Sequence, residues 1–206
     1  MASPQLAALK AQISKLDSFF ISRGKDVTAY TDAEHAQATA FMLMASAELE
    51  GYVESRCSSV AKAGVDRLRK SQPTATGRAL AVWYFTGRSL PQEMPIHEAD
   101  VLKKLALCDQ IQSAYASVVT NSHGISDKDF AKLSFPLGLR EATVPASLAL
   151  SLQTLAEKRN RAAHVHVNRA KSLAQPEEEA RFIEQIVGDL EVVDNAFDQL
   201  ISTFPI

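Results

Sequence analysis

Hydrophobic residues recur along the chain at alternating spacings of three and four residues, the pattern of a helix with one buried face. The first such stripe is formed by Leu6, Leu9, Ile13, Leu16 and Phe20. Ser3 is placed to cap this helix, and Pro4 stands in the first turn, where a missing amide N–H removes no helical bond. The spacing predicts a first helix that ends before Gly24.

A longer second helix is predicted to begin at Thr31. Glu34 follows three residues later, which gives the capping-box pattern of a helix N-terminus. Apolar positions recur from residue 41 and carry the helix to about Ala61, and residues 65–70 either continue it or form a separate turn. Pro73 lies in the segment that breaks the pattern, because proline cannot continue a helix.

The remainder of the chain predicts further helices separated by short polar connections. The helical segments are residues 76–85, residues 98–119, a short segment capped by Ser126, a segment opened by Pro145 that runs through residues 157–166, and a segment opened by Pro176. The connections are residues 87–96, 135–138 and 168–175. Three glutamates follow Pro176, where carboxylates favour the positive end of the helix dipole.

Strand alternation does not persist beyond four residues anywhere in the sequence, and no internal repeat or linker divides it. The pattern therefore predicts an all-α protein, with residues 1–206 in one helical-bundle domain that carries additional short helices.

The composition agrees with the all-α prediction and indicates the cellular compartment. Hydrophobic residues make up 46% and charged residues 22% of the 206, with only 8 Gly and 8 Pro. Cys57 and Cys108 are far apart and form no CxxC pair, which indicates two free thiols in a reducing compartment. The apolar runs are shorter than the ~20 residues of a membrane span. We expect a cytoplasmic protein that makes no use of a membrane.

Several common chemistries have no motif in this sequence. The glycine-rich phosphate loops, the serine nucleophile elbow and the HExxH zinc motif are all missing. His164 and His166 are two residues apart, so on a helix they point about 200° apart and suit one metal ion poorly. We therefore expect neither a metal nor a cofactor.

The densest chemical signal is a basic segment late in the sequence. Its cations are Lys158, Arg159, Arg161, Arg169 and Lys171, with no acid among residues 158–171. The chain has a net charge of -2, so this clustering makes a local positive field beside two histidines that titrate near neutral pH. The alternative interpretation is structural, because the helix dipole favours cations at a helix C-terminus.

Arg159, Asn160, Ala163 and His164 form an Arg-Asn-x-x-Ala-His pattern that resembles the signature of the HEPN superfamily, closest to the RiboL-PSP type of HEPN domain. Three other segments resemble the same branch. They are residues 43–54 with a Leu-Glu-x-Tyr core, residues 121–129 with a His-Gly-Ile turn, and residues 136–139. All of them occur in the expected order, so the resemblance covers about residues 41–166.

The resemblance implies a function and an assembly. Many HEPN proteins are metal-independent endoribonucleases of toxin–antitoxin, abortive-infection or other defence systems, with the active site formed where two copies of the motif meet in a homodimer. Others are noncatalytic modules that bind RNA, nucleotides or proteins. The expected ligand is thus single-stranded or looped RNA, not DNA, and an antitoxin or other partner protein is a possible regulator.

The residues suit this chemistry. Cleaving RNA without a metal needs a base for the 2′-hydroxyl, an acid for the 5′-oxygen and positive charge near the phosphate, and it leaves 2′,3′-cyclic phosphate and 5′-hydroxyl ends. His164 from each of two chains would supply acid and base, and Arg159 would bind phosphate oxygens. Lys158, Arg161, Arg169 and Lys171 are the expected RNA-binding cations.

Helix geometry qualifies the catalytic set. Arg159 and His164 lie about 140° apart on a regular helix, so Arg159 reaches the same ligand only through its long side chain, a helix distortion or a second chain. Asn160 shares a face with His164 and either orients it, binds phosphate or is an ordinary surface residue.

Two further positions follow from the resemblance. Glu50, carried over by position, would order Arg159 across the bundle, and Glu54 lies one helical turn later; the alternative is that both are ordinary carboxylates. In HEPN toxins controlled by a nucleotidyltransferase, a modified tyrosine stands two residues after the motif histidine. His166 occupies that position here, so adenylylation of that tyrosine is not implied.

The need for an acid and a base predicts a dimer, because each motif holds a single histidine. Sedimentation at micromolar concentration should show a dimer. A fully active protein that sediments only as a monomer would contradict this expectation.

Overall fold

A computed structural model describes residues 2–86, 99–164 and 175–202, and these residues are helical without any strand. The predicted all-α fold is therefore confirmed. The α-helices are α1 (Pro4–Phe20), α2 (Asp32–Arg69), α3 (Ala75–Thr86), α4 (Ala99–Thr120), α5 (Asp127–Ser134), α6 (Ala146–His164) and α7 (Pro176–Ile201). Short 3-10 helices cover Val27–Ala29, Phe135–Leu137 and Glu141–Thr143. The connections predicted over residues 87–96 and 168–175 lie outside the described residues, apart from Gln175.

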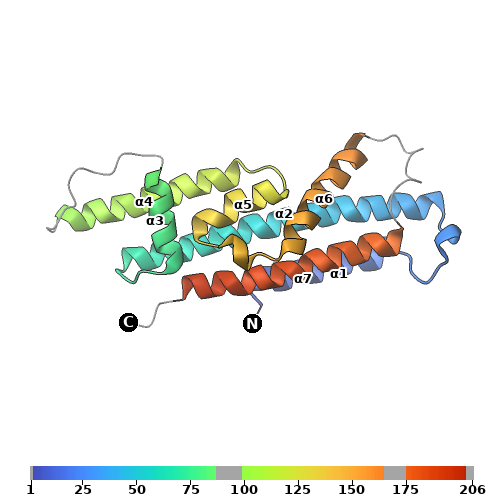
Figure 1. Ribbon diagram of the computed structural model, residues 1–206, viewed down its shortest axis with the longest axis horizontal. Helices are drawn as coiled ribbons and strands as arrows, with labels where there is room; N and C mark the ends of the chain where they lie inside the picture. The colour runs from blue at the N-terminus through green and yellow to red at the C-terminus, as the bar shows by residue number, and fades with distance from the viewer. Residues whose placement is uncertain (1, 87–98, 165–174, 203–206) are drawn as a thin grey trace.

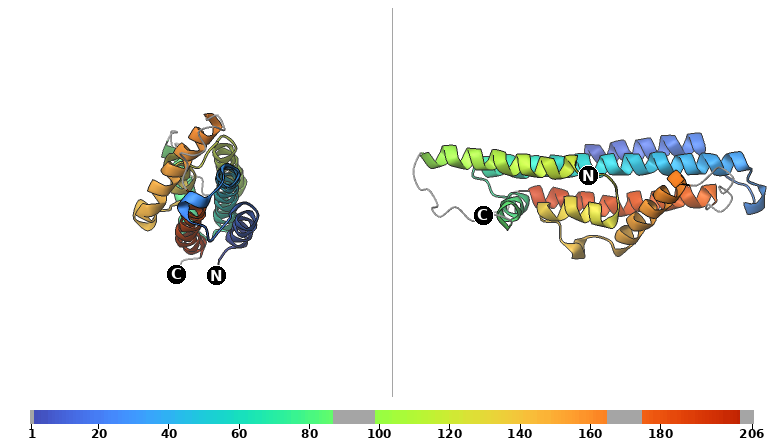
Figure 2. Two further views of the ribbon diagram at one scale, coloured as in Figure 1. Left: turned by 90° about the vertical axis from the view of Figure 1, so that its right-hand side faces the viewer. Right: turned by 90° about the horizontal axis from the view of Figure 1, so that it is seen from above.

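Helix α2 is the centre of the arrangement. It extends along the long axis of the molecule, with α1 and α7 beside it and α6 crossing it obliquely (Figure 1). Each of the other six α-helices packs on it. Figure 2 shows from above that α4, α2 and α1 lie on one side, whereas α3, α5 and α7 lie on the other.

The second helix extends further toward the C-terminus than the predicted end at about Ala61. Its 38 residues continue without interruption to Arg69, so residues 65–70 continue the helix and do not form a separate turn. Val60, Ala61 and Val65 are all buried, which extends the apolar face past the expected end. Ser71, with a φ of 59°, then turns the chain out of the helix.

The predicted helix starts are confirmed by their hydrogen bonds. The Leu6 amide donates to Ser3 Oγ at 3.1 Å. At the start of α2, the amide of Glu34 donates to Thr31 Oγ1, and the Glu34 carboxylate accepts from the Thr31 amide. The same reciprocal box is present at Ser126, and α7 begins at Pro176 with three glutamates in its first turn.

A buried carboxylate joins three of the helices. Asp194 of α7 is fully buried and accepts hydrogen bonds from the Ser3 amide at 2.8 Å and the Ser3 hydroxyl at 2.7 Å. Two groups from α2 reach the same carboxylate, Tyr52 Oη at 3.1 Å and Arg56 Nε at 2.7 Å. Arg56 also binds Asp198 on the next turn of α7. The Asp194 cluster, defined by these five residues, fixes α1, α2 and α7 against one another.

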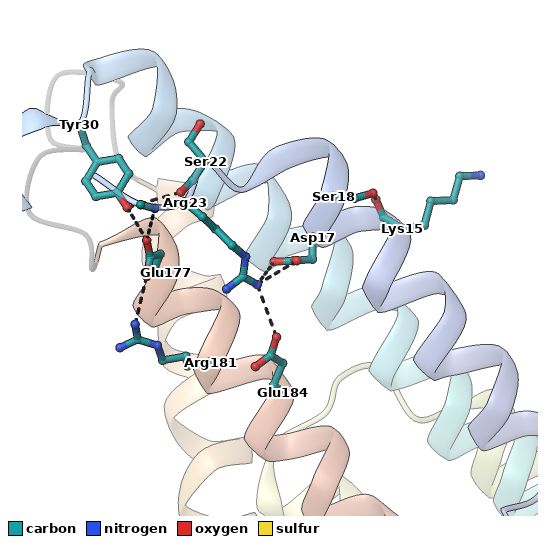
Figure 3. Close-up of polar contacts among 10 residues, drawn as sticks. Lys15, Asp17, Ser18, Ser22, Arg23, Tyr30, Glu177, Arg181 and Glu184 are labelled. Carbon is teal, nitrogen blue, oxygen red and sulfur yellow. Dashed lines mark hydrogen bonds and ion pairs between the residues drawn. The ribbon is translucent and has the colours of Figure 1, made fainter. Parts of the chain in front are cut away.

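A second set of polar contacts joins the end of α1 to the beginning of α7 (Figure 3). Arg23 binds both carboxylate oxygens of Asp17 at 2.8 and 2.9 Å and reaches Glu184 at 3.5 Å. Glu177 accepts from Tyr30 Oη at 3.2 Å and from the Gly24 amide at 2.7 Å. These contacts hold the first turns of α7 in place.

Two further sequence expectations concern the thiols and the membrane. Cys57 and Cys108 are both buried and free, as the sequence predicts. Among the helices of the described residues, none combines the length and the hydropathy needed to cross a bilayer.

The Asp194 cluster should dominate stability. Replacing Asp194 by Asn leaves Arg56 buried without its carboxylate, so the free energy of unfolding should fall by about 3 kcal/mol. Urea unfolding measures the change. Glu191→Gln is the matched control on the same helix, because it breaks an exposed ion pair with Lys10 and should cost less than about 1 kcal/mol.

The same cluster predicts how stability depends on pH. Burial opposes ionisation of Asp194, but hydrogen bonds from Ser3 and the charge of Arg56 outweigh it and hold its pKa below the ordinary value. A carboxylate whose pKa is lower in the folded protein than its unfolded value of about 3.9 stabilises the fold at pH values above that value. This stabilisation is lost as the pH falls further, through the pKa of the folded state. Asp194→Asn should therefore flatten the acid side of the stability profile; an Asn variant as stable as wild type would contradict both expectations.

Candidate functional site

The basic motif lies in the second half of α6, where this helix meets α2 and α7. Helix α6 packs on both of them and on α5, and its C-terminal half crosses α2 close to the connection between α4 and α5 (Figures 1 and 2). The helix is regular from Ala146 to His164. The helix distortion considered from the sequence is therefore absent between Arg159 and His164, which leaves side-chain reach or a second chain to bring them together.

Arg159 and Glu50 are brought together across the bundle. Arg159 Nη1 lies 3.0 Å from Glu50 Oε2, with the two side chains 39% and 23% exposed. The contact joins residues 109 positions apart in the sequence, and it is the pairing that the resemblance implies. The other guanidinium N–H groups of Arg159 have no partner among the residues that the structure describes. Within the described part of the chain, Arg159 is held by one bond, and its other guanidinium donors can bind an anion.

Lys158 makes a contact within the bundle that the sequence did not predict. Its ammonium group lies 2.7 and 2.9 Å from the two carboxylate oxygens of Glu179 and 4.6 Å above the ring of Phe182, both on α7. Glu179 is buried, so its charge needs this partner. Lys158 therefore ties α6 to α7, and its contribution to RNA binding stays a prediction.

The other predicted residues differ in what the structure says of them. Asn160 and Arg161 are exposed on the last turns of α6, and neither has a hydrogen bond or ion pair within the described part of the chain. His164 is the last residue of α6, and its side chain is outside what the structure describes. Arg169 and Lys171 lie outside the described residues altogether, so their contribution stays a prediction.

Glu54 lies one helical turn after Glu50 on α2 and is half-buried. Its carboxylate has no hydrogen-bond or ion-pair partner among the described residues. Burial raises the pKa of Glu54 above its ordinary value, the negative charge of Glu50 raises it further, and the charge of His123 opposes the shift. A charge effect of this kind falls off with distance, so His123 lies in the neighbourhood of Glu54.

His123 stands in a well-fixed turn between α4 and α5. Before it, Asn121 Nδ2 donates to the Ser117 carbonyl oxygen at 2.7 Å. After it, Gly124 has a φ of +144°, and a Cβ there would lie 2.8 Å from the carboxylate of Asp129. No local sequence pattern joins His123 to Glu54, because the two residues are 69 positions apart.

A separate hollow on the surface lies between α1 and α7 and has a volume of about 320 Å³. Its rim carries Lys10, Asp17 and Glu184, and Phe41 and Val187 contribute apolar lining. Lys10 is already bound to Glu191 at 2.7 Å, so the rim offers an anion no free cation. The end of α6 is the better candidate for phosphate chemistry.

The site combines the guanidinium of Arg159, the carboxylates of Glu50 and Glu54 and the imidazole of His123, groups that can bind an anion and exchange protons. Comparison with known proteins gave no match: no family model, curated protein or solved structure is similar to this chain. The function must therefore be inferred from these residues and from the resemblance of the motif.

Lys158 and Arg161 should separate stability from RNA affinity. Lys158→Ala leaves buried Glu179 without its cation and should lower the free energy of unfolding by about 2 kcal/mol, while the salt dependence of RNA affinity stays unchanged. Arg161→Ala, on the exposed face, should leave stability within about 0.5 kcal/mol and reduce the log–log salt slope by about 0.7. The reverse pattern would show that Lys158 contributes to RNA binding.

Proposed function

We propose that this chain is a metal-independent endoribonuclease of the HEPN type that cleaves single-stranded or looped RNA. The observation that carries the proposal is the half-exposed guanidinium of Arg159, fixed by Glu50 near the end of the helix that carries Asn160 and His164. Ordering a surface arginine costs side-chain entropy. Here a partner from another helix orders Arg159 before a ligand binds.

Each side chain has a stated role in the proposed reaction. Arg159 binds the scissile phosphate with the N–H groups that have no partner among the described residues and stabilises the charge that develops on it, while Glu50 holds the guanidinium in position. His164 transfers a proton to or from the reacting oxygens. Asn160, one turn before His164 on the same face, orients the imidazole or binds a phosphate oxygen. Arg161 contributes phosphate affinity, together with Arg169 and Lys171.

The proposed assembly is a homodimer in which the ends of two α6 helices face each other. Arg159 and His164 point about 140° apart on one regular helix, so a second copy is one way to place both groups on a single phosphate. The biological setting that this activity suggests is an effector of a toxin–antitoxin or anti-phage system, restrained by a partner protein.

A noncatalytic RNA-binding module is the competing function. It is favoured by the exposure of Arg161 and Asn160, which is sufficient for phosphate binding without any proton transfer. The two functions differ in what the Arg159 substitution does: the enzyme loses rate beyond any loss of affinity, and the module loses affinity alone.

Cleavage of a labelled RNA in excess EDTA tests the proposal. Wild type should cut and leave 2′,3′-cyclic phosphate ends. His164→Ala and Arg159→Ala should each lower the rate at saturating RNA by about 10²-fold or more, because they remove a proton carrier and transition-state charge. Arg181→Ala is the matched control, an exposed arginine on α7 that pairs only with Glu177 in the described part of the chain, and it should cut like wild type.

Two results would overturn the proposed metal-independent endoribonuclease activity. Wild type that binds RNA tightly but forms no product across varied substrates and pH supports the binding module. Cleavage that EDTA abolishes and zinc restores indicates a metal enzyme instead.

A further inference from the structure

We propose that Glu54 is a second proton-transfer group of this site, acting as the base for the 2′-hydroxyl while His164 acts as the acid, with His123 as the neighbour that adjusts its charge. The inference rests on the proposed function and names a carboxylate as the base of the same site. It differs from the expectation that two histidines from two chains share acid and base.

The position of Glu54 supports this role. Glu50 and Glu54 are four residues apart on α2, so their side chains share one face with Cβ atoms about 6 Å apart. Glu50 is committed to Arg159 by the 3.0 Å ion pair. The partly buried carboxylate of Glu54, by contrast, holds no partner among the described residues. A partly buried carboxylate without a hydrogen-bond or ion-pair partner lowers the stability of the fold, so a purely structural role does not explain its position.

The electrostatic surroundings of Glu54 point the same way. Burial and the neighbouring charge of Glu50 raise the pKa of Glu54 above its ordinary value. A carboxylate that binds its proton more tightly than usual is suited to act as a proton carrier. A raised pKa also brings Glu54 closer to the working pH, where a base is most effective.

His123 completes the surroundings of Glu54. Among the charged and titratable groups described, Glu50 on α2 and His123 in the α4–α5 turn are the ones that act on this carboxylate. Hydrogen bonds flank His123 in this turn, from Asn121 on one side and within the Ser126–Asp129 box on the other. Protonated His123 favours the ionised form of Glu54 and so limits the rise of its pKa.

The proposed step balances. The 2′-hydroxyl proton moves to the Glu54 carboxylate as the 2′-oxygen forms its bond to phosphorus. The bond between phosphorus and the 5′-oxygen breaks, and the 5′-oxygen takes the proton of protonated His164. Arg159 stabilises the negative charge of the phosphate throughout the step. Proton exchange with water then returns Glu54 and His164 to their starting forms.

The test is the rate of RNA cleavage as a function of pH. A base that must be ionised makes the rate rise with pH on the acidic limb. Glu54→Gln should lower the maximal rate by about 10²-fold and remove this limb, and Glu54→Asp should restore it in part. Glu48→Gln, an exposed glutamate on the same helix, is the matched control and should behave like wild type. Circular dichroism of each variant shows whether it is folded.

His123→Asn gives a readout that a merely structural role would not move. It removes the charge that lowers the pKa of Glu54, so the acidic limb should shift to higher pH. Carboxyl NMR titration follows the same group without relying on activity: the pKa of Glu54 should rise in His123→Asn and fall in Glu50→Gln.

The outcomes separate this inference from the proposed function. If wild type cleaves RNA through His164, but Glu54→Gln keeps both its rate and its acidic limb, the inference fails and the enzyme stands. If the titration shows a Glu54 pKa that neither variant changes, the inference fails as well. If wild type never cleaves RNA, both fall together.

Discussion

A carboxylate that is fully removed from water must have its charge balanced and its oxygens hydrogen-bonded, and Asp194 imposes this constraint on the fold. Its partners come from the N-cap of α1 and the middle of α2, so α7 has one position in which Asp194 is satisfied. That position determines the site as well. Helix α7 presents Glu179 to Lys158, and α2 presents Glu50 to Arg159, so the end of α6 is placed by the two helices that Asp194 joins.

Two adjacent cations hold the end of α6, and their directions explain which residues remain available. Lys158 and Arg159 are consecutive, so their side chains leave the helix about 100° apart and reach α7 and α2 respectively. Asn160 and Arg161 come next around the helix and point to solvent. The bundle thus uses one cation of the basic segment for cohesion, orders a second and leaves a third for a ligand. A count of basic residues in the sequence cannot distinguish these three uses.

Local patterns predicted the elements, and contacts distant in sequence decided the site. The helix starts at Ser3, Thr31 and Ser126 are predictable, because the side chain of a capping residue accepts a hydrogen bond from an amide within three residues of it. The end of α2 was harder to place, since small buried residues such as Ala61 and Gly64 weaken the apolar stripe. Glu50 was found only through the resemblance. The pairing of Lys158 with Glu179 and the approach of His123 to Glu54 depend on how α6 and the α4–α5 turn lie in space, which no periodicity encodes.

Helix α2 carries two interleaved stripes of polar residues within a single stretch of two turns. Glu50 and Glu54 face the candidate site, whereas Tyr52 and Arg56, offset by two residues and so about 200° around the helix, face Asp194. The candidate site and the buried Asp194 cluster thereby use opposite sides of the same seven residues. Substitution on one side need not disturb the other, so the chemistry of this surface can diverge between related chains while the scaffold that supports it is kept.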